Sequence, residues 1–166
     1  MGGDLVEQAS PLGQTQGDWF RFMAERMNDV LDAYSVHVYW NYWGRAKAAS
    51  RLKTIRKIVD ALPAETRKPV YVTEFGVRGS RPVGDAGPGS WDDGSPLEST
   101  NVSAFQQAWF ALQAARTGFA GAVKWDAYFG RYDLRPQAFG LIGPPNEGWP
   151  LRPGYNALRL LTRATR

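Results

Sequence analysis

The stretch Lys68-Pro69-Val70-Tyr71-Val72-Thr73-Glu74-Phe75-Gly76-Val77-Arg78 places a carboxylate at the end of a β-branched, apolar run. Lys68-Pro69 opens the run and Gly76 closes it, so we predict a strand over residues 70–75. Acidic residues are depleted in strands and are almost never buried without a partner. Glu74 therefore lies at a strand's C-terminal end, where parallel sheets and barrels keep their chemistry. A glutamate at the sheet edge that simply faces water remains the alternative.

The segments around this strand alternate between helical and strand-like spacing. Strands that alternate with helices indicate a parallel sheet with right-handed crossovers, so we predict an α/β fold. Helical spacing assigns Val30 to the buried side of the first helix, and Val102, Phe105, Trp109 and Leu112 to that of the third. The predicted strands cover residues 34–40, 70–75 and 119–126, and the predicted helices cover residues 18–33, 46–62, 102–116 (ended by Gly118) and a last segment that begins at Pro153.

The composition limits the classes of protein to which this chain could belong. The chain has 166 residues, of which 43% are apolar, which is enough for one globular domain with a core. Its net charge of +4 comes from scattered Lys and Arg residues without a basic stripe, so we expect no nucleic-acid partner. The sequence has 0 cysteines, which removes disulfides and thiolate metal sites. No apolar run reaches the ~18 residues of a membrane helix, so we expect no membrane partner.

Three predicted strands end in side chains that are unusual for a strand. The first ends in His37 and Tyr39, which are two residues apart and therefore share a face. The second ends in Glu74 and the third in Trp125. Because the ends of parallel strands meet at one edge, these side chains could converge. A tyrosine hydroxyl can hold one carboxylate oxygen and leave the other free to react, and an indole offers a flat apolar floor to a sugar ring.

The order of these motifs resembles the C-terminal part of the retaining glycoside hydrolases of clan A, especially the cellulase-like enzymes of family 5 and their relatives. Those enzymes are (β/α)8 barrels. Their sixth strand commonly carries a His-x-Tyr pair, matched by His37-Val38-Tyr39. Their seventh ends in the nucleophile of a Thr-Glu-Phe-Gly-like motif, matched by Thr73-Glu74-Phe75-Gly76. Their eighth ends in a Trp that lines the sugar subsite beside the cleavage point, matched by Trp125.

The resemblance implies a fold, an activity and site residues. Residues 1–166 would be a single C-terminal segment of a (β/α)8 catalytic domain, a partial TIM barrel of about the last three strand–helix units plus a preceding helix. Glu74 would be the nucleophile, with His37 and Tyr39 beside it, in a hydrolase of β-linked glycosides. Trp125 would line the substrate site, and the loop aromatics Trp91, Tyr128 and Trp149 could extend it or simply pack within their loops. We expect no metal and no cofactor, because the isolated loop carboxylates Asp126 and Asp133 lack the spacing of a Ca²⁺ loop.

The sequence departs from the family in length. A full barrel needs about 250 residues and eight strands. The family's acid/base glutamate follows an Asn on the fourth strand, a region with no counterpart here, and Asn146-Glu147 lies in the wrong place. We therefore expect a fragment that is inactive alone and that associates with the missing half or with itself. Met1-Gly2-Gly3-Asp4 lacks signal-peptide features, so we leave localisation open, with secretion expected if the full-length protein carries a signal.

Two other classes of protein remain open at this stage. A non-catalytic carbohydrate-binding α/β domain would keep the aromatic residues without the acid/base. A small flavodoxin-like domain would match the motifs by accident, and the absence of a Gly-rich phosphate loop after the first strand disfavours it.

Overall fold

The computed structural model describes residues 3–4, 16–41, 44–78, 100–128, 140–143 and 145–165. They form two compact units that interleave along the chain. The first unit comprises Met1–Tyr39, Ala46–Phe75 and Leu112–Val123, and the second comprises Trp40–Arg45, Gly76–Ala111 and Lys124–Arg166. The elements, in order, are β1 (Gly3–Asp4), α1 (Gln16–Arg26), β2 (Tyr34–Asn41), α2 (Arg45–Asp60), β3 (Val70–Arg78), α3 (Asn101–Arg116), β4 (Gly121–Lys124) and α4 (Pro153–Ala164), with short 3-10 helices at Asn28–Val30, Ala64–Thr66 and Pro145–Glu147.

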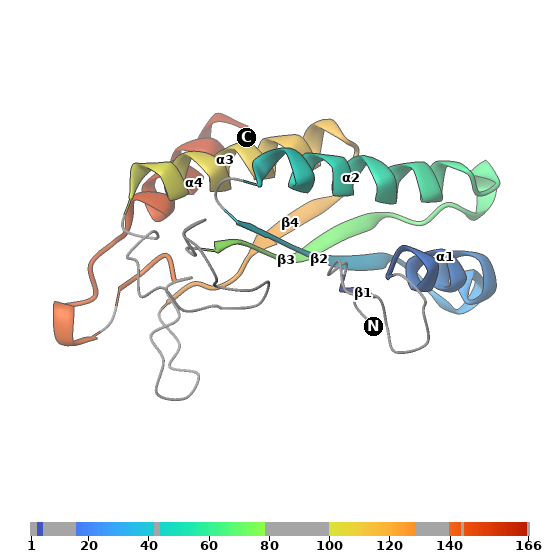
Figure 1. The fold of residues 1–166 in the computed structure, drawn as a ribbon, viewed down its shortest axis with the longest axis horizontal. Helices are drawn as coiled ribbons and strands as arrows, with labels where there is room; N and C mark the ends of the chain where they lie inside the picture. The colour runs from blue at the N-terminus through green and yellow to red at the C-terminus, as the bar shows by residue number, and fades with distance from the viewer. Residues whose placement is uncertain are drawn as a thin grey trace, which may run out of the picture. The chain divides into compact units, whose positions relative to one another are not determined.

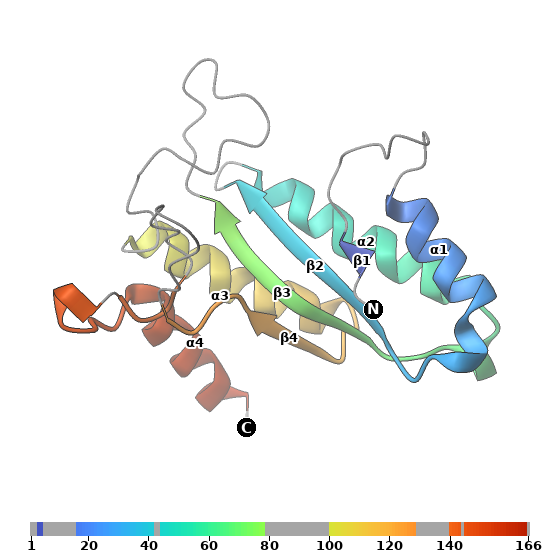
Figure 2. The same ribbon diagram turned by 90° about the horizontal axis from the view of Figure 1, so that it is seen from below.

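The strands form one sheet in the order β1-β2-β3-β4, which is also their order along the chain. β1 pairs with β2 in parallel, with Gly3 opposite Val36 and Asp4 opposite His37, and the arrowheads of β2, β3 and β4 point the same way in Figure 2. The predicted partial barrel is confirmed, and β1 adds a short strand before α1 that the sequence did not reveal. Among the described strands the order never reverses, so they form no switch point, which argues against the flavodoxin-like alternative.

The core of the first unit lies between the sheet and α2, which covers one face (Figure 1). Within residues 34–40 of β2 the even positions are buried and the odd positions are half-buried, as period-two alternation predicts. α2 contributes a stripe at helical spacing. Its fully buried members are Ala48, Leu52, Ile55 and Val59, which accompany Val36, Val38, Val70 and Val72 of the strands.

The burial pattern of β3 changes phase within the strand. Val70 and Val72 are buried, Thr73 and Glu74 are both half-buried, and Phe75 is buried again. Strict alternation would give Glu74 the same face as Val70 and Val72, because side chains two apart share a face. Glu74 instead accepts a hydrogen bond from Tyr39, which lies on the half-buried face of β2. Glu74 therefore does not lie on the helix-covered face.

The C-terminal end of α3 confirms the predicted stop at Gly118. Gly118 has a positive φ of 82°, its N–H donates to Ala115 O at 3.0 Å, and the N–H of Phe119 donates to Ala114 O at 3.0 Å. This pair of hydrogen bonds is the Schellman arrangement, which needs a left-handed residue that glycine supplies without a Cβ penalty.

Two predicted burial patterns are wrong. α1 ends at Arg26 and a 3-10 helix follows, so Val30 is exposed. On α3 the predicted apolar side is largely outside, with Val102, Phe105 and Leu112 exposed and Trp109 half-buried. The buried side instead combines Phe110 and two alanines with Ser103, Gln106 and Gln107. Hydrogen bonds lower the cost of burying these polar side chains: Trp40 Nε1 donates to Gln106 Oε1 at 2.8 Å, and Gln107 Nε2 donates to Ser103 Oγ at 2.7 Å.

Strand β4 is shorter than predicted. It covers Gly121–Lys124, so Phe119 precedes it and Trp125 follows it directly. Beyond it, in the second unit, three segments are joined by hydrogen bonds. Leu141 N donates to Asp126 O at 3.2 Å, and Arg152 N donates to Leu141 O at 2.9 Å. These bonds hold the chain after β4 against the start of α4.

Candidate active site

The carboxylate of Glu74 is held by two side chains from the neighbouring strand, all within the first unit. The Tyr39 hydroxyl donates to Glu74 Oε2 at 2.8 Å. His37 Nδ1 lies 3.4 Å from the same oxygen. The structure thus brings together three residues that the sequence singled out on two strands, β2 and β3.

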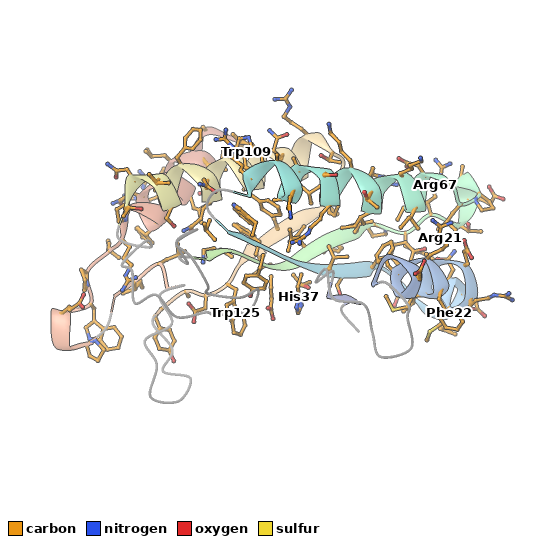
Figure 3. All side chains as sticks on the ribbon, in the orientation of Figure 1. Arg21, Phe22, His37, Arg67, Trp109 and Trp125 are labelled. Carbon is orange, nitrogen blue, oxygen red and sulfur yellow. The ribbon has the colours of Figure 1, made fainter. Side chains whose placement is uncertain are left out.

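The strands position these groups through their alternation. His37 and Tyr39 occupy the half-buried face of β2, and Figure 3 shows His37 on the side of the sheet away from α2. The phase change in β3 turns Glu74 to that same face. The side chains of His37 and Glu74 are 27% and 26% exposed, so the pair is partly desolvated yet open to a ligand.

The two oxygens of Glu74 are not equivalent. Both neighbours contact Oε2, and among the residues that the structure describes no hydrogen bond reaches Oε1. A carboxylate with one oxygen fixed and the other unengaged can attack an electrophilic carbon without first breaking a hydrogen bond.

One contact of the site escaped the sequence analysis. Arg51 of α2 donates from Nη1 to the main-chain oxygen of Tyr39 at 2.6 Å. In the sequence Arg51 is one of several basic residues on a helix, and nothing in its spacing separates it from the others.

The other predicted site residues lie in the second unit or outside the described residues. Trp125 is half-buried, a cis peptide bond joins it to Asp126, and Figure 3 shows it on the side away from α3. Tyr128 and Trp149 form an edge-to-face pair with ring centroids 6.3 Å apart, and they are 56% and 51% exposed. Trp91 is outside the described residues, and a substrate-binding role for any of the four remains a prediction.

Neither a metal site nor a membrane span is found in the described part of the chain. There, no three His, Asp or Glu side chains gather closely enough to hold an ion. None of its helices is both long and apolar enough to cross a bilayer.

Comparison with known proteins gave matches only among solved structures. No protein-family model and no curated protein matches the sequence. The catalytic core of xylanase A is similar with a TM-score of 0.61 and 10% identity, over 96% of this chain and 48% of that one. The α-L-arabinofuranosidase from Thermotoga maritima is similar with a TM-score of 0.60 and 18% identity, over 87% and 29%. The endo-1,4-β-D-mannanase from Thermotoga petrophila has a TM-score of 0.54 and 17% identity, over 92% and 38%.

These similarities define the class of fold. The similar structures are clan A glycoside hydrolases, as the motifs indicated, and the chain spans less than half of each. Four successive strand–helix units, from β1–α1 to β4–α4, are half of the eight in a full barrel. The chain therefore has the fold of a partial (β/α)8 barrel, similar to part of the barrel in those structures.

Proposed function

We propose that this chain is the nucleophile-bearing part of a retaining glycoside hydrolase that acts on β-linked glycosides. The observation that carries the proposal is the Tyr39–Glu74 hydrogen bond of 2.8 Å, with His37 at 3.4 Å on the same oxygen. The C-terminal parts of the strands in such barrels hold the catalytic residues, and Glu74 lies on β3, four residues before that strand ends at Arg78. The glycosidase fold of the similar structures supports the assignment.

The mechanism proceeds in two displacements. Glu74 Oε1 forms a bond to the anomeric carbon while the bond to the leaving oxygen breaks, giving a glycosyl-enzyme. A second carboxylic acid gives its proton to the leaving oxygen and then takes a proton from the water that releases the sugar. Tyr39 and His37 hold Oε2, so the carboxylate rotates little as its charge is lost.

The second carboxylic acid has to lie about 5–5.5 Å from Glu74 in a retaining enzyme. The resemblance assigns it to a fourth barrel strand that has no counterpart in this chain. We therefore expect hydrolysis only when the remaining strands are supplied. Trp125 would form the apolar floor of the sugar site next to the cleavage point, and Trp91 would belong to the wider substrate surface.

A mechanism-based label tests the nucleophile directly. The chain is co-expressed with the missing half of the barrel taken from its parent gene and incubated with an aryl 2-deoxy-2-fluoro-β-glycoside. This substrate forms the intermediate and releases it slowly. Mass spectrometry should find the added sugar on the peptide that contains Glu74. Glu74→Gln should abolish both label and turnover, whereas Glu65→Gln, an exposed glutamate on the Ala64–Thr66 turn, should change neither. Turnover retained in Glu74→Gln would end the proposal.

A second candidate function is sugar binding without hydrolysis, and the exposed Tyr128–Trp149 pair favours it. Trp149 has a positive φ of 57°, which a bulky side chain rarely adopts, and Gly143 N donates to Pro150 O at 2.8 Å beside it. Rings fixed in this way would present apolar faces to a pyranose. Oligosaccharide titration of the chain should show binding that Trp149→Ala removes. Binding without turnover in the completed barrel would favour this candidate over the first.

A further inference from the structure

We infer that Arg51 is a positioning residue of this site, which holds the main chain of Tyr39 so that its hydroxyl reaches Glu74. The inference rests on the proposed role of Glu74, but its central contact can be tested without any turnover. It adds a residue from a helix to a site otherwise built from two adjacent strands.

The geometry follows from the place of Arg51 on α2. Arg51 directly precedes Leu52 and lies one turn before Ile55, both of which are fully buried. Its side chain is half-buried, so the aliphatic stem runs along the covered side of the helix while the guanidinium extends to the end of β2. There Nη1 meets the carbonyl oxygen of Tyr39 at 2.6 Å.

This contact fixes Tyr39 at both ends. The carbonyl is held by a cationic donor, which makes a stronger hydrogen bond than a neutral one. The hydroxyl is held by Glu74 Oε2 at 2.8 Å. A small movement of the peptide at Tyr39 is transmitted along the rigid ring to the hydroxyl. A displacement of about 1 Å at a reacting group can lower the reaction rate by about a hundredfold.

Other arginines nearby make contacts of a different kind. Arg56, on the same helix, pairs with Asp60 at 2.7 Å across one turn of an exposed surface. Arg67 donates to the carbonyl oxygens of Leu62 and Asp60 in the connection after α2. Neither contact involves a residue of the site, so Arg56 is the matched control for Arg51.

His37 provides the probe. It is the sole histidine of the sequence, so every imidazole signal belongs to it. Proton–nitrogen NMR of the full chain reports the surroundings of its Nδ1, and the carbonyl-carbon shift of Tyr39 reports the Arg51 contact. We expect Arg51→Met to move the Tyr39 carbonyl signal and to move the His37 signals in the direction that Tyr39→Phe moves them. Arg51→Lys should restore part of both changes, and Arg56→Met should leave both signals in place.

Two results would overturn the inference. One is unchanged His37 and Tyr39 signals in a folded Arg51→Met chain, and the other is an equal change in Arg56→Met. If the Arg51→Met chain does not fold, the Tyr39 carbonyl signal and the His37 imidazole signals are compared between Arg51→Lys and Arg51→Gln instead. In the completed barrel, Arg51→Met should lower kcat about tenfold to a hundredfold with KM nearly unchanged. Absence of turnover in the unmodified protein would count against the proposed function, while the NMR signals would still decide the role of Arg51.

Discussion

The phenolic oxygen of Tyr39 lies 2.8 Å from Oε2 of Glu74, and the two residues stand on adjacent strands, β2 and β3. Their hydrogen bond joins positions 35 residues apart in the sequence. It requires the register of both strands to be correct, because a slip of one residue would send either side chain to the opposite face. The site is therefore a product of strand pairing as much as of residue type.

Tyr39→Phe tests this relationship through catalysis. The variant keeps the ring and loses the donor to a charged acceptor, a loss of about 1.5–3 kcal/mol, which corresponds to roughly a tenfold to hundredfold fall in rate. Kinetics of the completed barrel should show this fall in kcat. Tyr71→Phe, on the exposed part of β3, should leave kcat unchanged. Equal effects of the two substitutions would contradict a specific role for Tyr39.

Trp40→Phe tests the polar buried side of α3. Trp40 stacks on Phe110 with ring centroids 4.6 Å apart and donates to Gln106 Oε1 at 2.8 Å. Removing the donor takes this hydrogen bond away from a buried oxygen, which costs about 1–3 kcal/mol. The free energy of urea-induced unfolding should fall by at least this much. Leu112→Ala, at an exposed position of α3, should lower the free energy of unfolding by about 0.5 kcal/mol or less. A larger loss would indicate that the apolar side of α3 predicted from the sequence is buried after all.

Tyr34 should make the fold sensitive to alkali. Burial raises the pKa of the Tyr34 hydroxyl, which donates to Asn28 Oδ1. Because the folded chain holds this proton more tightly than the unfolded chain, its contribution is complete below about pH 10, the unfolded value. It is lost as pH rises from there through the raised pKa. Unfolding free energies between pH 8 and 11 should show a decline that Tyr34→Phe reduces. An identical decline in both chains would refute the assignment.

Gly118→Ala tests the end of α3. The positive φ of 82° is unfavourable for any residue with a Cβ, by roughly 1–2 kcal/mol. An added Cβ would meet only Arg56 Cδ, at 3.9 Å, so the cost is conformational and not steric. Thermal unfolding should show this loss for Gly118→Ala and a smaller one for Gly118→Asn, because asparagine tolerates the left-handed region. An Asn variant less stable than the Ala variant would argue against the conformational cause.

Local chemistry was enough to predict much of this protein. The alternation of helical and strand-like spacing specified a parallel sheet, and each predicted strand is present. Gly118 stops α3 as expected, because its conformation depends on no distant residue. The motif around Glu74 indicated a strand with an unusual carboxylate, since carboxylates are rare in such a setting, but the strand runs on to Arg78, beyond its predicted end at residue 75.

Only the tertiary structure decided which way the decisive side chains face. The pattern of β3 by itself leaves Glu74 on the face of Val70 and Val72, and the change of phase that turns it to Tyr39 has no sequence signal. On α3, hydrogen bonds from Trp40 to Gln106 and from Gln107 to Ser103 allow polar residues to be buried while Phe105 is exposed. Hydrophobic periodicity reflects only how favourable it is on average to bury each type of side chain. Which face of a helix is buried also depends on hydrogen-bond partners, and some of these lie tens of residues away in the sequence.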